Sequence, residues 1–112
     1  MDRDLEVTPR EVRDALAGPD PPAIIDCRRP DEHAFCALGA PGEALVPMHE
    51  IAARLGELDP LRDRDVVIYC HTGRRSLWAA RYLRAHGFGG ARSMAGGIDL
   101  WSRDIDPAVP RY

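Results

Sequence analysis

The segment 66–69 (VVIY) constrains the fold of this chain most, because it is apolar at every position and rich in β-branched residues. A strand with one solvated face alternates apolar and polar side chains, whereas a continuous apolar run is typical of a strand covered on both faces. The segment therefore predicts a central strand of a parallel sheet, with Cys70 at its carboxyl end.

Helices and strands are predicted to alternate on both sides of this segment. One helix begins with the capping-box pattern of Thr8, Pro9 and Glu11 and ends near Gly18. The spacing of apolar residues predicts the remaining elements. These are short strands at 23–26, 43–47 and 91–94, a helical turn from Pro30, and helices over 48–58, from Ser76 to His86 and opening at 96–101.

This alternation predicts a single α/β domain over residues 1–112, with an open parallel sheet and helices on both faces. Ligands of such sheets bind at the carboxyl ends of the strands, near a switch in strand order. Because Cys70 follows the most apolar strand, its position favours a role in chemistry.

Composition excludes several classes of partner. A formal net charge of -3 makes nucleic acid an unexpected partner. There is no run of about 18 apolar residues that could span a membrane, and the first residues lack the apolar core of a secretory signal. Three cysteines, an odd number, do not suggest a disulfide framework. We therefore expect a cytoplasmic protein in a reducing compartment.

The residues after Cys70 are those that would stabilise a thiolate. Gly73 allows a tight turn that aims backbone amides inward, and Ser76 is expected to begin a helix whose dipole is positive at that end. Arg74 and Arg75 add positive charge. Such surroundings lower a cysteine pKa from about 8.5 to about 3.5–7.5. The alternative is an inert buried thiol, which is the commoner state of a cysteine after a core strand.

Four segments resemble motifs of the rhodanese (sulfurtransferase) family. Residues 70–76 (CHTGRRS) resemble its active-site loop, C-x-x-G-x-R-S. Residues 24–33 (IIDCRRPDEH) are similar to D-V-R-x-P-x-E-Y, 41–47 (PGEALVP) to P-G-A-x-x-I-P, and 94–101 (MAGGIDLW) to L-x-G-G-x-x-x-W. The chain departs from the pattern at Cys27, which replaces valine, at His33, which replaces an aromatic residue, and in a longer segment at 33–42.

The resemblance implies a five-stranded parallel sheet and transfer of sulfane sulfur through a persulfide on Cys70, without a cofactor. A donor such as thiosulfate would be attacked by Cys70, and cyanide or a thiol would accept the sulfur. Arg75 would orient the loop or bind the donor. The other residues expected to bind substrate are His71, Thr72, Gly73, Arg74 and Ser76. A sulfur-relay protein is a further possible partner.

Supporting roles remain open for several other residues. Asp26, with Glu32, is expected either to hold Arg28 or the cysteine loop in place, or to form ordinary surface pairs. The pairs Arg28–Arg29 and Arg74–Arg75 either meet to attract a small anion or are separately solvated. Cys27 is expected to pack in the core, and Cys36 to be a spectator thiol or a redox partner of Cys70. The spacing of cysteines and histidines predicts no metal site.

The sequence is compatible with two alternative functions. One is a persulfide carrier or regulatory interaction domain of the same fold. The other is a cysteine phosphatase or arsenate reductase, whose phosphate loop in related folds has the spacing C-x5-R. Here Cys70 and Arg75 have the spacing C-x4-R, and the shorter loop favours a single sulfur atom over phosphate.

Overall fold

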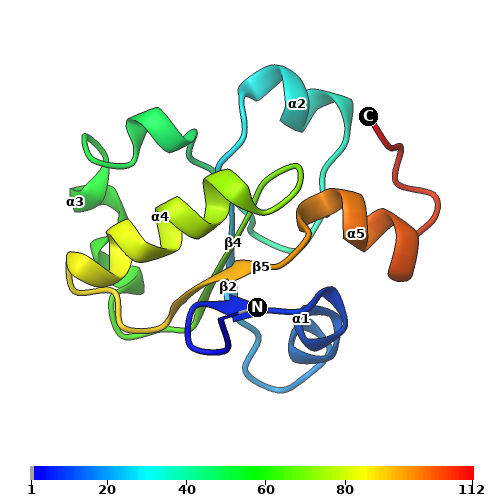
Figure 1. The fold of residues 1–112 in the computed structure, drawn as a ribbon. Coiled ribbons are helices and arrows are strands. Elements are labelled where there is room, and N and C mark those ends of the chain that lie inside the picture. Colours follow the sequence, from blue (N-terminus) through cyan, green and yellow to red (C-terminus); the bar gives the residue numbers. More distant parts are fainter. Residues whose placement is uncertain (1) are drawn as a thin grey trace.

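The computed structural model describes residues 2–112 and contains a five-stranded sheet in the order β1-β5-β4-β2-β3 (Figure 1). Every neighbouring pair of strands is parallel. The strands are β1 (Glu6–Val7), β2 (Ala23–Asp26), β3 (Ala44–Leu45), β4 (Val66–Tyr69) and β5 (Ala91–Met94). The predicted central strand is confirmed, since β4 lies between β5 and β2 and all four of its residues are buried.

Helices cover both faces of the sheet, as predicted. On one face, α1 (Pro9–Leu16) and α5 (Gly97–Asp104) pack on alternate residues of β2 and β4. On the other, α3 (Leu55–Leu58) and α4 (Arg74–Ala85) cover the remaining residues of these strands. The short helix α2 (Pro30–Phe35) follows β2 and lies beside the C-terminus (Figure 1). Helix α2 therefore lies at the end of the sheet where the carboxyl ends of β2 and β4 are found.

The capping box predicted for the first helix is present. The Thr8 side chain accepts a hydrogen bond from the Glu11 amide at 3.1 Å, and Glu11 in turn accepts one from the Thr8 amide at 3.0 Å. Pro9 occupies the first turn, where a backbone amide would have no partner within the helix, so its missing N–H costs no hydrogen bond. No helix within residues 2–112 has the length and apolar character that a membrane span requires.

Three details differ from the sequence-based expectation. The segment 48–58 is a 3-10 turn (Met48–Glu50), a series of turns and the short α3, where a single helix was predicted. Its apolar residues recur at helical spacing because they cover one patch of core, which successive turns do as well as a helix. The helix after the cysteine loop begins at Arg74, two residues before Ser76. Strand β1 was missed because it has only two residues.

Candidate active site

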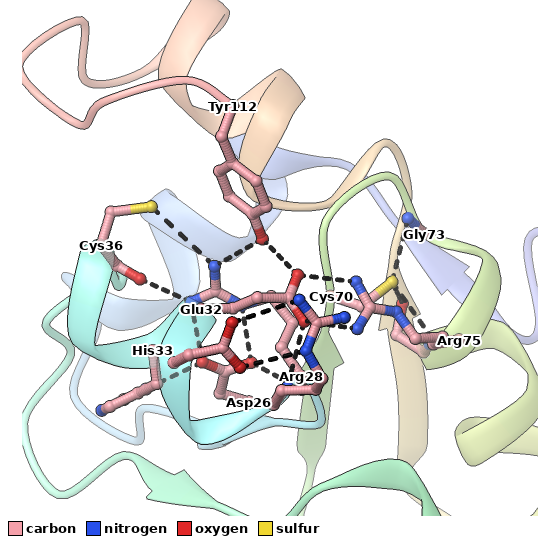
Figure 2. Close-up of polar contacts among 12 residues, drawn as sticks. Asp26, Arg28, Glu32, His33, Cys36, Cys70, Gly73, Arg75 and Tyr112 are labelled. Atoms are coloured by element: carbon pink, nitrogen blue, oxygen red, sulfur yellow. Dashed lines mark hydrogen bonds and ion pairs between the residues drawn. The ribbon is translucent and has the colours of Figure 1, made fainter.

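Cys70 lies directly after β4, and its sulfur is surrounded by hydrogen-bond donors (Figure 2). The Gly73 amide lies 3.1 Å and the Ser76 amide 3.4 Å from Cys70 Sγ, and the Ser76 hydroxyl lies 3.3 Å away. Gly73 has a φ of 102°, a left-handed conformation that favours glycine, and it caps α4. The loop therefore turns back over its own cysteine, which is only 1% exposed.

These contacts stabilise the thiolate. The pKa of Cys70 is lowered to about 5, first by the neighbouring Cys27 thiol and then, against the opposing effect of burial, by Ser76 and the Gly73 amide. The thiolate is consequently the main form at neutral pH. The loop amides and the start of α4, which were expected to stabilise a thiolate, are among the groups that lower this pKa, whereas the charge of Arg74 and Arg75 is not among its main causes.

The N-terminus of α5 holds the backbone of the cysteine loop. The Ile98 amide donates to the Cys70 carbonyl at 2.9 Å, and the Asp99 amide donates to the His71 carbonyl at 3.0 Å. A Cβ at Gly97 would lie 2.4 Å from the His71 carbonyl oxygen and 2.5 Å from that of Cys70. The glycine is therefore required for the close approach of helix and loop.

Arg75 is bound to α2. Its guanidinium donates two hydrogen bonds to the Glu32 carboxylate, at 2.7 and 2.9 Å. The Arg75 pair is the main reason that the pKa of Glu32 lies well below its usual range. The Tyr112 hydroxyl donates to the same carboxylate at 2.7 Å (Figure 2). Arg75 thus anchors the first turn of α4 to α2.

A buried ion pair lies below this contact. Asp26 and Arg28 are both fully buried, and Arg28 donates to both carboxylate oxygens of Asp26, at 2.9 and 2.8 Å. Arg28 also donates to the Cys36 carbonyl at 2.6 Å and to the Tyr112 hydroxyl at 2.8 Å. The pair joins β2 to the segment after α2 and to the C-terminal residue, so it is internal rather than a surface pair.

Asp26 also belongs to a group of potential metal ligands. His33 Nδ1 lies 2.8 Å from Asp26 and 3.9 Å from Glu43, and ligand atoms of the three residues lie within 4.8 Å of one another. The Arg28 guanidinium already contacts both oxygens of Asp26. Both oxygens of Asp26 are therefore engaged by protein partners, Arg28 and His33.

The two arginine pairs form neither of the two arrangements expected, a joint anion site or two separately solvated pairs. Arg28 is paired with Asp26 inside the core, and Arg75 is paired with Glu32. Arg29 pairs with the exposed Asp31 at 3.0 Å. Carboxylates therefore neutralise these guanidinium groups, and only Arg74 is left exposed on the loop without an ion pair among residues 2–112.

The other predicted loop residues do not touch the sulfur with their side chains. Thr72 and Arg74 are exposed, and the His71 ring stacks on the Tyr112 ring at a centroid distance of 3.9 Å. Tyr112 was missed by sequence reasoning, because nothing in the sequence near a chain terminus indicates a contact with residues 28 and 32. Burial raises the pKa of the Tyr112 hydroxyl to about 12, which keeps it a hydrogen-bond donor to Glu32.

A pocket of about 200 Å³ opens beside the loop. Cys27 and Arg75 line it, together with Arg28, Arg29, Pro47, Met48 and His49. The three cysteines of the chain are free thiols. Cys36 lies on the opposite face of the sheet from Cys27 and Cys70, in the core cluster that contains Val12 and Trp101.

Fold and site together define a class: a parallel α/β domain whose central strand ends in a cysteine held as a thiolate by the following loop and helix. The sequence model of the protein family described as Rhodanese-like domain matches residues 8–104 of this chain. This chain belongs to the rhodanese-like domain family.

Relatives with sulfurtransferase names resemble the chain over nearly its whole length. A sulfurtransferase of Allochromatium vinosum is 38% identical over 104 residues, which are 93% of this chain and 94% of that protein. The probable adenylyltransferase/sulfurtransferase MoeZ of Mycobacterium tuberculosis is 35% identical over 106 residues, 95% of this chain but 26% of that protein. These relatives support a transferase role in sulfur chemistry.

Solved structures have the same fold. The human single-domain sulfurtransferase TSTD1 aligns with a TM-score of 0.76 and 25% identity over 92% of this chain and 98% of that one. The reduced CoADR-RHD protein of Bacillus anthracis aligns with a TM-score of 0.79 and 27% identity over 94% of this chain and 18% of that one. The implied five-stranded rhodanese-like sheet is confirmed.

Proposed function

We propose that this protein transfers sulfane sulfur from an anionic donor such as thiosulfate to cyanide or a thiol, through a persulfide on Cys70. The observation that carries the proposal is the enclosure of Cys70 Sγ by the Gly73 amide and by the amide and hydroxyl of Ser76. These donors hold a thiolate first and an anionic persulfide afterwards. No cofactor is needed for either step.

In the first half-reaction, the Cys70 thiolate attacks the outer sulfur of thiosulfate. A bond forms between Cys70 Sγ and that sulfur, the sulfur–sulfur bond of the donor breaks, and sulfite leaves with the bonding electron pair. No general base is required, because a pKa of about 5 makes Cys70 a thiolate before the donor arrives.

In the second half-reaction, an acceptor attacks the outer sulfur of the persulfide and Cys70 leaves as a thiolate. The same donors then stabilise the departing charge, much as an oxyanion hole does. Cyanide gives thiocyanate, and a thiol gives a new persulfide. Arg75 acts in this scheme by fixing the first turn of α4 against α2 through Glu32.

Arg75 also supports sulfur over phosphate as the transferred group. A phosphatase loop needs its arginine to bind the phosphate oxygens, whereas both terminal nitrogens of Arg75 donate to Glu32. The enclosed cradle at Cys70 suits one added atom better than a tetrahedral anion. Para-nitrophenyl phosphate is therefore expected to be a poor substrate.

A sulfur-relay protein is proposed as the acceptor or donor partner in the cell. Domains like this one form 26% of MoeZ and 25% of the Arabidopsis thaliana adenylyltransferase and sulfurtransferase MOCS3. The names of these proteins join sulfur transfer to a second activity. A carrier that only receives persulfide from a partner would keep the same Cys70 chemistry but would not react with thiosulfate.

The test is turnover of thiosulfate and cyanide by wild-type protein and two serine variants. Cys70→Ser is expected to abolish thiocyanate formation, because the nucleophile is lost. Cys36→Ser is the matched control and should retain activity, because Cys36 packs on the other face of the sheet. Absence of turnover in wild-type protein that still accepts sulfur from a persulfide donor would favour the carrier.

A further inference from the structure

Cys27 stands opposite Cys70 at the ends of two neighbouring strands. The register of β2 and β4 pairs Ile25 with Ile68 and Asp26 with Tyr69, and the Cys27 amide continues the ladder by donating to the Tyr69 carbonyl at 3.0 Å. One residue further along, Cys27 and Cys70 are the next pair. Side chains two residues apart along a strand share a face, so both thiols extend the Ile25–Ile68 pair.

Packing confirms this placement. Both cysteines are 1% exposed and belong to the core cluster on one face of the sheet, whereas Cys36 belongs to the cluster on the other. The neighbouring Cys27 thiol is also the first cause of the lowered pKa of Cys70. Neighbouring strands are roughly 4.8 Å apart, which lies within the 4.4–6.8 Å range of Cα separations that a disulfide spans.

We propose that Cys27 is a resolving thiol, which attacks the Cys70 persulfide and releases its outer sulfur as hydrosulfide. This inference rests on the proposed persulfide function. The Cys27 sulfur forms a bond to Cys70 Sγ, the bond between Cys70 Sγ and the outer sulfur breaks, and that sulfur leaves with the electron pair. The proton of the Cys27 thiol moves to it. The sulfane sulfur is reduced to hydrosulfide, and the two thiols are oxidised to a disulfide.

The surroundings of the Cys27 thiol also set the rate of this step. The neighbouring Cys70 sulfur and burial both raise the pKa of Cys27, so Cys27 attacks as a thiol that gives up its proton during the reaction. Attack by such a thiol is slow. An acceptor that reaches the persulfide therefore takes the sulfur first, and hydrosulfide release is the outcome when no acceptor arrives.

The disulfide is reset by an external dithiol. Cys27 lines the pocket that also contains Arg75 and His49, so Cys27 is the side from which a small dithiol would approach the disulfide. Until it is reduced, Cys70 cannot accept sulfur. The pair would thus convert sulfane sulfur to hydrosulfide at the cost of one dithiol per turnover.

The test compares wild-type protein, Cys27→Ser and Cys36→Ser, each reduced, freed of reductant and mixed with thiosulfate without an acceptor. Serine keeps a hydroxyl donor beside Cys70, so Cys27→Ser should still gain one sulfur atom, and its rate of gain is measured beside that of wild type. Wild type and Cys36→Ser should then release hydrosulfide and form a disulfide that peptide mapping assigns to Cys27 and Cys70. In Cys27→Ser the sulfur adduct should persist at least about tenfold longer.

Equal lifetimes of the adduct in wild type and Cys27→Ser would overturn the role of Cys27. Inorganic polysulfide is used as a second donor, to separate this result from failure of the proposed function. If thiosulfate adds no sulfur but polysulfide-loaded wild type forms the disulfide and releases hydrosulfide, the donor reaction is wrong and the resolving role stands. If neither donor yields an adduct or hydrosulfide in wild type, both are overturned.

Discussion

Cys70 directly follows a strand in which no side chain is exposed, and the Cys27 thiol, Ser76 and the Gly73 amide lower the pKa of its thiol. A thiol in the same place without those donors would be more acidic only if a cation lay nearby, since burial alone raises a thiol pKa. Arg75, in the first turn of α4, is already paired with Glu32, and Arg74 is exposed. The groups that contact the Cys70 sulfur, rather than an arginine charge, therefore make the thiol acidic and reactive.

Alkylation of Cys70 by iodoacetamide, followed against pH, tests this residue-level account. The pKa of the thiol is lowered, so the reactive thiolate is lost only as the pH falls through the folded value, and the rate should rise with an inflection near 5. Cys27→Ala should move the inflection upward by about one unit, since a hydrogen bond to a charged group contributes about 1.5–3 kcal/mol. A wild-type inflection at or above about 8.5, the value of free cysteine, would contradict the account.

The junctions between elements hold the loop in shape. The first residues of α5 donate to the carbonyls of Cys70 and His71, and α2 holds Arg75 through Glu32. The sequence motif 94–101 contains two glycines whose purpose is visible only in three dimensions, where Gly97 lies against the carbonyls of the loop. The cysteine loop is thus held in place by contacts with both α2 and α5.

Gly97→Ala is expected to disrupt the contact with α5. The new Cβ would lie 2.4 Å from a carbonyl oxygen at a φ of 60°, so helix and loop must separate. We expect a loss of about 1–3 kcal/mol in the free energy of unfolding, with a slower gain of sulfur from thiosulfate. The control is Gly56→Ala, where a Cβ meets nothing within 4 Å. Equal sulfur loading by the two variants would refute the role of this contact.

Tyr112→Phe tests the contact between the C-terminal residue and α2. The change removes a hydroxyl that donates to Glu32 and accepts from Arg28, while it keeps the ring that stacks on His71. We expect a loss of about 1–2 kcal/mol in urea unfolding, because the buried Arg28 loses one partner. Tyr112→Ala, which also removes the stack, should lose more. If Tyr112→Phe is as stable as wild type, the hydroxyl does not contribute.

At the scale of the whole molecule, the alternation of helices and strands in the sequence predicted the sheet, its central strand and the place of Cys70. Local patterns were enough there, because β4 is apolar throughout and Thr8 and Glu11 form a capping box. The partners of Arg75 and Arg28 were not predictable, since they depend on contacts between residues far apart in the chain. Cys27 was assigned to packing because strand register, which places it opposite Cys70, is not encoded locally.

Asp26→Asn tests the ion pair that joins distant parts of the molecule. Removing one partner leaves Arg28 buried without its countercharge, which costs about 3–5 kcal/mol. Against a typical total of about 5–15 kcal/mol, the variant should unfold at a much lower urea concentration. Asp31→Asn, which alters an exposed pair with Arg29, is the control and should unfold as wild type does. Similar midpoints for both variants would show that the buried pair is not required for stability.

The central claim is that Cys70 accepts sulfane sulfur, and its most direct test is the mass of the intact protein after brief exposure to thiosulfate without an acceptor. Cys27→Ser protein is used, since its adduct should persist. The account predicts a gain of one sulfur atom with release of one sulfite per chain, and no gain in a Cys27→Ser, Cys70→Ser double variant. Unchanged mass in the folded Cys27→Ser protein, or the same gain in the double variant, would contradict it.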